Sequence, residues 1–306
     1  NIELDGKTIP LGGVLGDQQA SLMGQACLDE GNIKNTYGTG SFLLLNIGQK
    51  PKISKSNMLT TVAWRLNGKS TYALEGSIYN AGTCVSWMKN QAKLMKPPDE
   101  SEQLSFSVDN TLGVKFVPAF NGLGAPFWDD DIRAGFYNIT QGVTKAHMVR
   151  AVLESVANCV KAIMDQMQKD SNIDITSIRV DGGMSVNKFF MQYQSDLLNK
   201  QVYVAKEPES TSLGAAYICG LTFGAFSDFD DIRIRFFEAK NPKAVVLLVH
   251  GMVEHIQRYE YFAKSLNKVG LSVFAFDLRA HGKSAKSPDY VGKYDGDLFL
   301  DSVRDV

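Results

Sequence analysis

Three short segments combine glycine with polar side chains. The first, Gly16-Asp17-Gln18-Gln19, places a carboxylate and two amides at a predicted loop-to-helix junction. An Asp beside a bound hydroxyl can take its proton as the oxygen attacks a phosphorus atom, and Gln18 can then hydrogen-bond a neighbouring hydroxyl. A helix N-cap explains the same residues without any chemistry. Asp17 is therefore a candidate general base, with helix capping as the alternative.

The second segment is Tyr37-Gly38-Thr39-Gly40. Two glycines let the backbone approach a ligand closely, and their amides can point at phosphate oxygens. Thr39 adds a hydroxyl donor. An ordinary glycine hairpin is the alternative interpretation, so this segment alone does not establish a ligand site.

The third segment, Val180-Asp181-Gly182-Gly183, ends a predicted strand and runs into a helix. A strand that turns through glycines into a helix is an arrangement that binds anions. Asn187 follows four residues after Gly183, about one turn up the predicted helix, where its side chain can meet a base or ribose. By itself this segment is weak evidence for a ligand.

The elements that must position these segments alternate between strand and helix. Hairpins are predicted over residues 2–14, 35–46 and 59–74, because each contains a glycine turn between apolar runs. Further helices are predicted over residues 17–27, 80–94, 185–198 and 211–226, the last a small-residue helix packed closely on a sheet, and strands over 175–180 and 202–205.

The clearest helix is predicted over residues 144–170, with Thr144 as its N-cap. Apolar residues recur there at steps of three and four, which is typical of one buried helix face. They are Val149, Leu153, Val156, Val160, Ile163 and Met167.

Composition limits the classes of function. The chain has 306 residues, 44% of them hydrophobic and 21% charged, with a formal net charge of -1. This is typical of a globular protein of two domains, and the absence of a basic excess argues against nucleic acid as a partner. The longest apolar stretch, residues 213–226, is shorter than the roughly 18–20 residues of a membrane span. The sequence leaves a homo-oligomer open.

The cysteines and histidines do not indicate a metal site. Neither CxxC spacing nor histidine spacing for a metal ligand set occurs. We expect buried free thiols in a reducing, cytoplasmic compartment. The cysteines are Cys27, Cys84, Cys159 and Cys219.

Taken together and in order, six motifs resemble those of the glycerol kinases in the FGGY carbohydrate kinase family. The resemblance covers approximately residues 8–230 and implies the family's C-terminal domain, an α/β, actin-like (ribonuclease-H-like) ATPase fold. The motifs are Gly-Asp-Gln-Gln (16–19), Asn-Thr-Tyr-Gly-Thr-Gly (35–40), Gly-Leu-Gly-Ala-Pro-Phe-Trp-Asp (122–129), Val-Asp-Gly-Gly (180–183), Met-Gln-Tyr-Gln-Ser-Asp-Leu-Leu (191–198) and Thr-Ser-Leu-Gly-Ala-Ala-Tyr (211–217).

The resemblance implies phosphorylation of glycerol to glycerol 3-phosphate by ATP, accompanied by Mg²⁺. On the substrate side it implies that Asp17 is the base for the glycerol hydroxyl. Gln18 would bind glycerol together with Asp17, and Phe42 would lie against the glycerol carbons.

On the nucleotide side the resemblance implies that Thr39 contacts the transferred phosphate. Gly82, Gly183 and Asn187 would contact the nucleotide. Two positions depart from the family pattern: Ser86 stands where a nucleotide-contacting Gln is usual, and Asn138 stands where a glycine is usual.

The largest departure is the N-terminal domain, which in the family supplies the first phosphate loop and most of the polyol pocket. The 306 residues contain no counterpart, and they begin at Asn1 rather than Met. Since the active site lies in a cleft between two domains, we expect the chain alone to be inactive as a kinase.

A change of composition at residues 227–231 predicts a second segment. Strands are predicted over residues 232–237, 244–249 and 271–276, with a helix over 258–269. We therefore expect a kinase C-terminal nucleotide-binding domain over residues 1–230 and an incomplete α/β-hydrolase βαβ segment over residues 231–306.

The motifs His250-Gly251-Met252 and, further on, His281-Gly282 resemble a monoacylglycerol-lipase-type α/β-hydrolase, in which the amide of Met252 would belong to the oxyanion hole. The sequence contains no Gly-x-Ser-x-Gly, so His250 and His281 are interpreted as structural turn residues. A lipid esterase fragment and a non-catalytic nucleotide-binding module remain the alternatives to a kinase. A fragment, a fused gene model and a true fusion all stay open.

Overall fold

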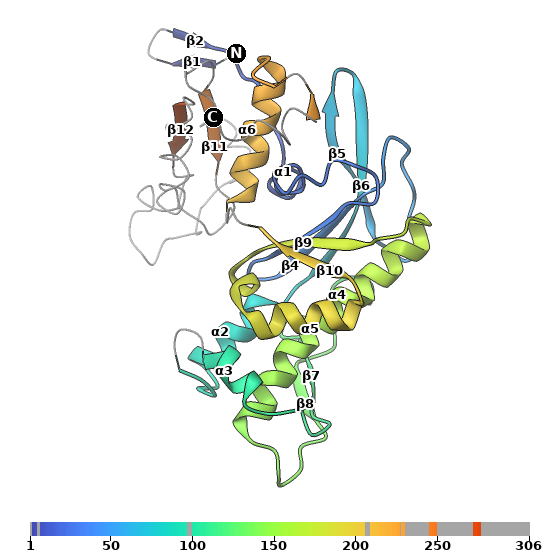
Figure 1. The fold of residues 1–306 in the computed structure, drawn as a ribbon, viewed down its shortest axis with the longest axis vertical. Coiled ribbons are helices and arrows are strands. Elements are labelled where there is room, and N and C mark those ends of the chain that lie inside the picture. Colours follow the sequence, from blue (N-terminus) through green and yellow to red (C-terminus); the bar gives the residue numbers. More distant parts are fainter. Residues whose placement is uncertain are drawn as a thin grey trace. The chain divides into compact units, whose positions relative to one another are not determined.

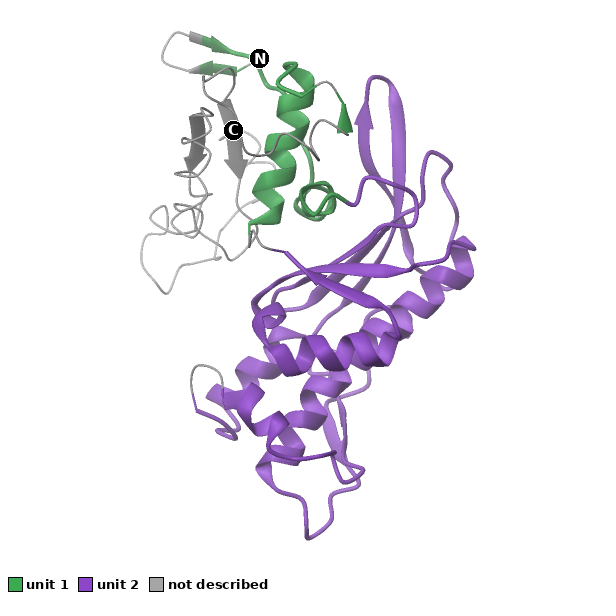
Figure 2. Cartoon of the chain, viewed as in Figure 1, with its two compact units in different colours: residues 1–26, 209–306 green, residues 27–208 purple. Residues whose placement is uncertain are grey.

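The computed structural model describes residues 2–4, 7–96, 100–205, 209–226, 228–229, 245–249 and 272–276 (Figure 1). The chain divides into two compact units, one of residues 1–26 with 209–306 and one of residues 27–208 (Figure 2). A domain boundary near residue 230 stays a prediction. None of the helices in the described ranges has the length and apolar character that a membrane crossing requires.

A mixed sheet of six strands forms the centre of residues 27–208, in the order β10-β9-β3-β4-β6-β5. Strands β3, β4, β6 and β5 are joined in antiparallel pairs, which confirms the hairpins predicted at residues 35–46 and 59–74. Strand β9 is parallel to both β3 and β10. The strands are β3 (Ile33–Tyr37), β4 (Ser41–Asn46), β5 (Leu59–Leu66), β6 (Lys69–Ile78), β9 (Ser177–Gly182) and β10 (Gln201–Val204).

Helices α4 (Lys145–Ser171) and α5 (Lys188–Leu198) pack against one face of this sheet (Figure 1). All six apolar residues of the predicted face of α4 are at most 1% exposed, which confirms that helix. Thr144 is its N-cap, and the Thr144 amide donates to Nδ1 of His147 at 3.1 Å. Burial of this face is therefore the main attachment of α4 to the sheet.

The predicted helix over residues 185–198 is divided in two. A 3₁₀ turn covers Gly183–Val186, and α5 begins only at Lys188, so Asn187 is the N-cap rather than a residue one turn up the helix. Asn187 has an extended backbone, and its side chain accepts a hydrogen bond from the Phe190 amide. Asparagine caps helices in this way more favourably than it continues them.

Three elements of this unit were not predicted, namely α3 (Glu100–Phe106), β7 (Lys115–Val117) and β8 (Gly135–Tyr137). The buried residues of α3 are Ser101 and Ser105, so the helix has no apolar stripe in the sequence. The antiparallel pair β7–β8 has only three residues per strand. Helix α2 (Gly82–Asn90) was predicted, although it is shorter than residues 80–94.

The other unit contains α1 (Asp17–Gly24) and α6 (Ser210–Thr222), whose backbones approach closely. A Cβ atom added at Gly24 would lie 1.8 Å from the Ser210 carbonyl oxygen, and one added at Gly214 would lie 1.8 Å from that of Ala20. Small residues in α6 thus allow close contact with a helix within this unit, whereas the sequence suggested contact with a sheet.

The same unit contains two pairs of strands. Strands β1 (Ile2–Leu4) and β2 (Lys7–Ile9) form the predicted N-terminal hairpin. Strands β11 (Val245–Val249) and β12 (Ser272–Phe276) are parallel, as predicted for residues 244–249 and 271–276. The strand predicted over residues 232–237, the helix over 258–269, and His250, Met252 and His281 lie outside the described residues.

All four cysteines are free, as predicted. Three are buried, and Cys159 is half-buried. Burial raises the pKa of the Cys84 thiol to about 12 and that of Cys159 to about 11. Both groups are therefore protonated and unreactive at neutral pH.

The pairing of β3 with β9 brings two backbones into direct contact. Tyr37 is the register partner of Gly182. Gly182 has φ +88° and ψ 178°, and a Cβ atom there would lie 2.2 Å from the Tyr37 carbonyl oxygen. The adjacent Gly183 has nothing within 4 Å of its Cβ position. Only the first of the two glycines is thus required by the fold.

We expect Gly182→Ala to lower the free energy of unfolding by about 1–3 kcal/mol, because an alanine must adopt a backbone conformation that only glycine accepts readily. Gly183→Ala is the matched control and should change it by less than about 0.5 kcal/mol. Urea unfolding of the whole chain measures both. Equal stabilities of the two variants would contradict the assigned register.

Candidate functional site

The turn at residues 38–40 rests on the start of α2. The Gly82 amide donates to the Gly38 carbonyl at 3.1 Å, while the amides of Ala81 and Thr83 both donate to the Thr39 carbonyl at 3.0 Å. A Cβ atom at Gly82 would lie 2.4 Å from the Gly38 carbonyl oxygen, so glycine is needed for this approach. Thr39 and Gly82, both predicted from the sequence, are therefore neighbours, and the Thr39 side chain is exposed.

A cavity of about 370 Å³ opens within the same compact unit, and Val85 of α2 is among the residues that line it. Residues of α2, α3 and α4 and the segment that leads into α5 line it, including Val85, Ser101, Leu153, Gly183 and Asn187. Because Gly183 has no side chain and no neighbour within 4 Å of its Cβ position, its backbone faces open space. The volume lies within the range of roughly 300–1,000 Å³ that holds small ligands and cofactors.

Asn187 lines the cavity with both ends of its amide already bonded. Its Oδ1 accepts from the Phe190 amide at 2.9 Å, and its Nδ2 donates to Ser101 Oγ at 3.1 Å. The next amide, that of Lys188, donates to the Glu102 carboxylate. Two side chains of α3 thus hold the first turn of α5 in place.

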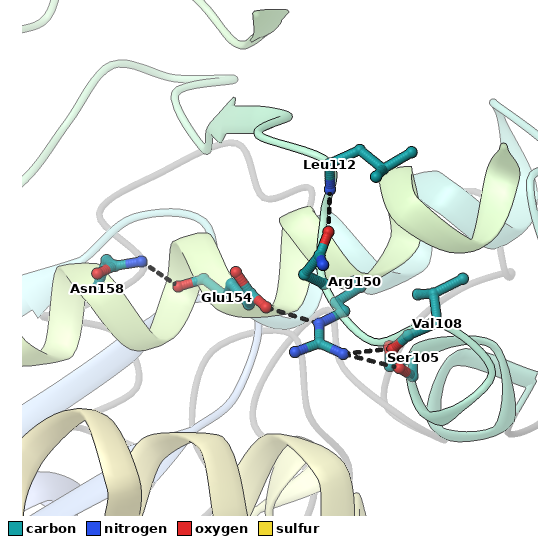
Figure 3. Close-up of polar contacts among 7 residues, drawn as sticks. Ser105, Val108, Leu112, Arg150, Glu154 and Asn158 are labelled. Carbon is teal, nitrogen blue, oxygen red and sulfur yellow. Dashed lines mark hydrogen bonds and ion pairs between the residues drawn. The ribbon is translucent and has the colours of Figure 1, made fainter. Parts of the chain in front are cut away.

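Arg150 of α4 fixes α3 from its other end (Figure 3). Its guanidinium donates to the carbonyls of Val108 at 2.5 Å and Ser105 at 3.5 Å, and its Nε donates to Glu154 at 2.8 Å. The guanidinium carbon also lies 4.9 Å from the centre of the Phe189 ring in α5. One cation therefore connects α3, α4 and α5.

Tyr37, which directly precedes the turn at residues 38–40, contacts α5. Its hydroxyl donates to Oε1 of Gln194 at 3.2 Å, and its ring meets that of Phe190 edge-on at 5.1 Å. Burial raises the pKa of Tyr37 above its usual value, so the hydroxyl stays a donor. Gln194 is fully buried and donates in turn to the Ala157 carbonyl. Both residues belong to motifs noted in the sequence, but their role is structural support.

The predicted substrate residues are not among those that line this cavity. Phe42 is half-buried on β4, opposite Thr36 and Ser77. Asp17 and Gln18 belong to the other compact unit, at the start of α1. Within residues 27–208, Thr39 and Gly82 are thus neighbours and Gly183 and Asn187 line one cavity, whereas Asp17 and Gln18 belong to the other unit.

Asp17 is the first residue of α1 and Gly16 is the N-cap, so the alternative prediction that Asp17 is the N-cap is wrong. Asp17 Oδ1 accepts from the Gln18 amide at 2.8 Å, and the Asp17 side chain is exposed. A carboxylate here gains from the helix dipole and remains accessible to a substrate.

Asn138 and Ser86, the two residues that depart from the family pattern, both lie in described parts of the structure. Asn138 has φ +61°, a conformation that asparagine tolerates better than most residues, so it can replace glycine there. Its Nδ2 lies 3.4 Å from the Gly113 carbonyl. Ser86 is exposed on α2, next to Val85 at the cavity.

The chain is similar in sequence to known carbohydrate kinases. Residues 33–223 match the FGGY family of carbohydrate kinases, C-terminal domain. The curated glycerol kinase of Oceanobacillus iheyensis is 48% identical over 235 residues, which cover 77% of this chain and 47% of the relative. That of Bacillus subtilis is 48% identical over 227 residues, covering 74% and 46%. The chain spans about half the length of these curated relatives.

Solved structures confirm the predicted actin-like fold. The crystal structure of Plasmodium falciparum glycerol kinase with ADP aligns with a TM-score of 0.69 at 44% identity, over 72% of this chain and 44% of that one. A xylulose kinase from Lactobacillus acidophilus, at 23% identity and a TM-score of 0.63 over 70% of this chain and 43% of that one, shares the fold. Residues 240–306 match the family described as serine aminopeptidase, S33, which confirms an α/β-hydrolase segment.

Removing the Arg150 guanidinium should loosen α3. We expect Arg150→Met to lower the free energy of unfolding by about 1–3 kcal/mol, because the variant loses charge-assisted hydrogen bonds to two carbonyls. Lys161→Met on the same helix is the matched control. It breaks an exposed ion pair with Asp165 and should cost less than about 0.5 kcal/mol. Urea unfolding measures both, and equal losses would show that Arg150 is no more than a surface charge.

Proposed function

Because the chain belongs to the FGGY family of carbohydrate kinases, we propose that it supplies the nucleotide-binding half of a glycerol kinase. The reaction transfers a phosphoryl group from ATP to glycerol and gives glycerol 3-phosphate and ADP. The observation that supports this most is a cavity lined by Gly183 and Asn187, in a chain 48% identical to curated glycerol kinases. The turn with Gly38, which accepts a hydrogen bond from the Gly82 amide, follows the strand that pairs with the one ending at Gly182.

The nucleotide side of the site offers suitable groups. The exposed turn with Thr39 presents a hydroxyl and backbone amides to phosphate oxygens. Gly183 leaves room for the nucleotide to lie against the backbone, and Asn187 offers a neutral amide to a base or ribose. Among the described residues, no group of three or more His, Cys, Asp or Glu side chains is arranged so that it could hold a metal ion. Mg²⁺ held through ATP phosphates needs only one or two protein carboxylates.

On the substrate side, Asp17 accepts the proton of the glycerol hydroxyl while the oxygen attacks the terminal phosphorus of ATP. Gln18 binds a second glycerol hydroxyl, and Phe42 covers the carbon chain. Such a reaction depends mainly on positioning, since the phosphoryl group requires little covalent help from protein groups. The curated relatives are about twice as long as the matched region, so we expect these 306 residues alone to bind nucleotide with negligible turnover.

Residues 240–306 carry no second function in this proposal. They match a hydrolase family, but the sequence contains no Gly-x-Ser-x-Gly motif to place a nucleophile. A nucleotide-binding module without catalysis is the remaining alternative, and Asp17 is the residue that separates it from a kinase.

We expect the chain to bind ADP weakly in isothermal titration calorimetry. Gly183→Ala should raise the dissociation constant by about five- to hundredfold, because the added methyl group fills space that the nucleotide needs. Gly142→Ala, where the new methyl group meets only Leu112 at 3.8 Å, is the control and should bind as the wild type does. No detectable ADP binding by the wild-type chain would refute the proposal.

Joining the chain to the N-terminal domain of a glycerol kinase should give glycerol-dependent ADP release. In that protein we expect Asp17→Asn to lower kcat by about 10²–10⁴-fold, since the amide cannot take a proton. KM should change less than kcat, because in this proposal Gln18 also binds glycerol and the asparagine at position 17 can still form a hydrogen bond to it. An Asp17→Asn enzyme with a near-normal rate would mean that this residue only supports the start of α1.

A further inference from the structure

The short helix α3 meets the cavity through side chains that form hydrogen bonds. Ser101 is 7% exposed, and its Oγ accepts from Nδ2 of Asn187 at 3.1 Å. On the next residue, the Glu102 carboxylate accepts from the Lys188 amide. Ser101, Glu102, Asn187 and Lys188 all line the same cavity. These contacts connect α3 to the first turn of α5 at the place where the proposed nucleotide lies.

The two hydrogen bonds of Asn187 determine how its amide is oriented. Its oxygen faces the Phe190 amide, so its nitrogen must face the other way, toward Ser101. An amide nitrogen has two hydrogens, and one of them remains for a ligand. Ser101 keeps its hydroxyl hydrogen as a second donor, because its oxygen acts as acceptor in the pair. The pair therefore keeps two donor hydrogens that its own hydrogen bonds do not use.

We infer that Ser101 is a positioning residue for nucleotide binding, which holds the Asn187 amide with one N–H directed to an acceptor on the base or ribose. The inference rests on the proposed function. It adds the kind of atom that the pair recognises: Ser101 and Asn187 offer hydrogen-bond donors, and the purine ring nitrogens and ribose oxygens of a nucleotide are acceptors. Without the Ser101 hydroxyl, Asn187 would still cap α5 but would lose the restraint on its nitrogen.

The helix that carries Ser101 is held by contacts that involve no ligand. The other end of α3 is held by Arg150 through the carbonyls of Ser105 and Val108, and Phe106 meets Phe189 of α5 edge-on at 5.4 Å. The restraint on Asn187 thus comes from an anchored helix rather than from a free loop, and preorganised groups bind ligands more tightly.

Ser105, four residues further along α3, is a matched control. It is fully buried, and within the described residues its Oγ has no hydrogen-bond partner, whereas its carbonyl, which an alanine retains, accepts from Arg150. Replacing either serine with alanine removes one hydroxyl from the same helix. Only the Ser101 hydroxyl contacts a residue proposed to bind the nucleotide.

The test is calorimetric titration of the full chain with ADP, with the thermal unfolding midpoint recorded for every variant. We expect Ser101→Ala to raise the dissociation constant about three- to tenfold, the value of one hydrogen bond. Ser105→Ala should bind as the wild type does, and Ser101→Thr, which keeps the hydroxyl, should restore most of the affinity. Ser101→Cys, of similar size with a weak acceptor, should weaken binding in the same direction as alanine.

A double-mutant cycle separates positioning from a general loss of structure. In an Asn187→Ala background, Ser101→Ala should change the dissociation constant less than about twofold, because the residue on which it acts is gone. An unchanged affinity in Ser101→Ala, or a full effect of Ser101→Ala without Asn187, would overturn the inference alone. A wild-type chain that binds no ADP would overturn the proposed function and the role of Ser101 with it.

Discussion

The parallel pairing of β3 with β9 leaves no room for a side chain between Tyr37 and Gly182. A Cβ atom at Gly182 would lie 2.2 Å from the Tyr37 carbonyl oxygen, and the backbone there has φ +88°. Since Gly38 follows Tyr37 and Gly183 follows Gly182, this contact places two glycine turns at one edge of the sheet. Gly183, the residue after β9, lines the cavity.

The three glycines at this edge serve different purposes. Gly182 and Gly82 are needed because a neighbouring backbone lies within about 2.4 Å of where a Cβ would be, so the fold itself excludes larger residues. Gly183 has open space instead, and nothing in the fold requires it to be glycine. A glycine that the fold does not need, facing a cavity, agrees with the proposed approach of a nucleotide to the backbone.

The sequence predicts this unit well where a local signal exists. Glycine turns between apolar runs gave the hairpins, and the apolar recurrence from Val149 to Met167 gave α4, because both patterns reflect burial of a single face. Helix α3 carries no such signal, since serines occupy its buried positions. Its stability comes from tertiary contacts with Arg150 and α5 that a window of neighbouring residues does not contain.

In the candidate site, too, residues with a local sequence signal were predicted and residues held by distant contacts were not. Thr39, Gly183 and Asn187 were proposed because they lie in or beside short motifs of glycine and polar residues, and Gly82 was proposed from the family resemblance. The role of Tyr37 was missed, because its partner Gln194 lies 157 residues away and is fully buried. Ser101 was missed for a similar reason, with 86 residues between it and Asn187. Residues that support a site from a distance leave no pattern in the sequence that could reveal them.

The polar groups of the nucleotide side are paired within one compact unit. Asn187 with Ser101, Lys188 with Glu102, and Tyr37 with Gln194 each form their hydrogen bonds without any contribution from the unit that carries Asp17. A nucleotide that binds to such a surface does not have to order it first, which lowers the entropic cost of association.

Positioning the attacking hydroxyl is a separate task, because Asp17 and Gln18 belong to the other unit. Nucleotide affinity and catalytic rate should therefore depend on different residues, the first on the α3–α5 junction and the second on the start of α1.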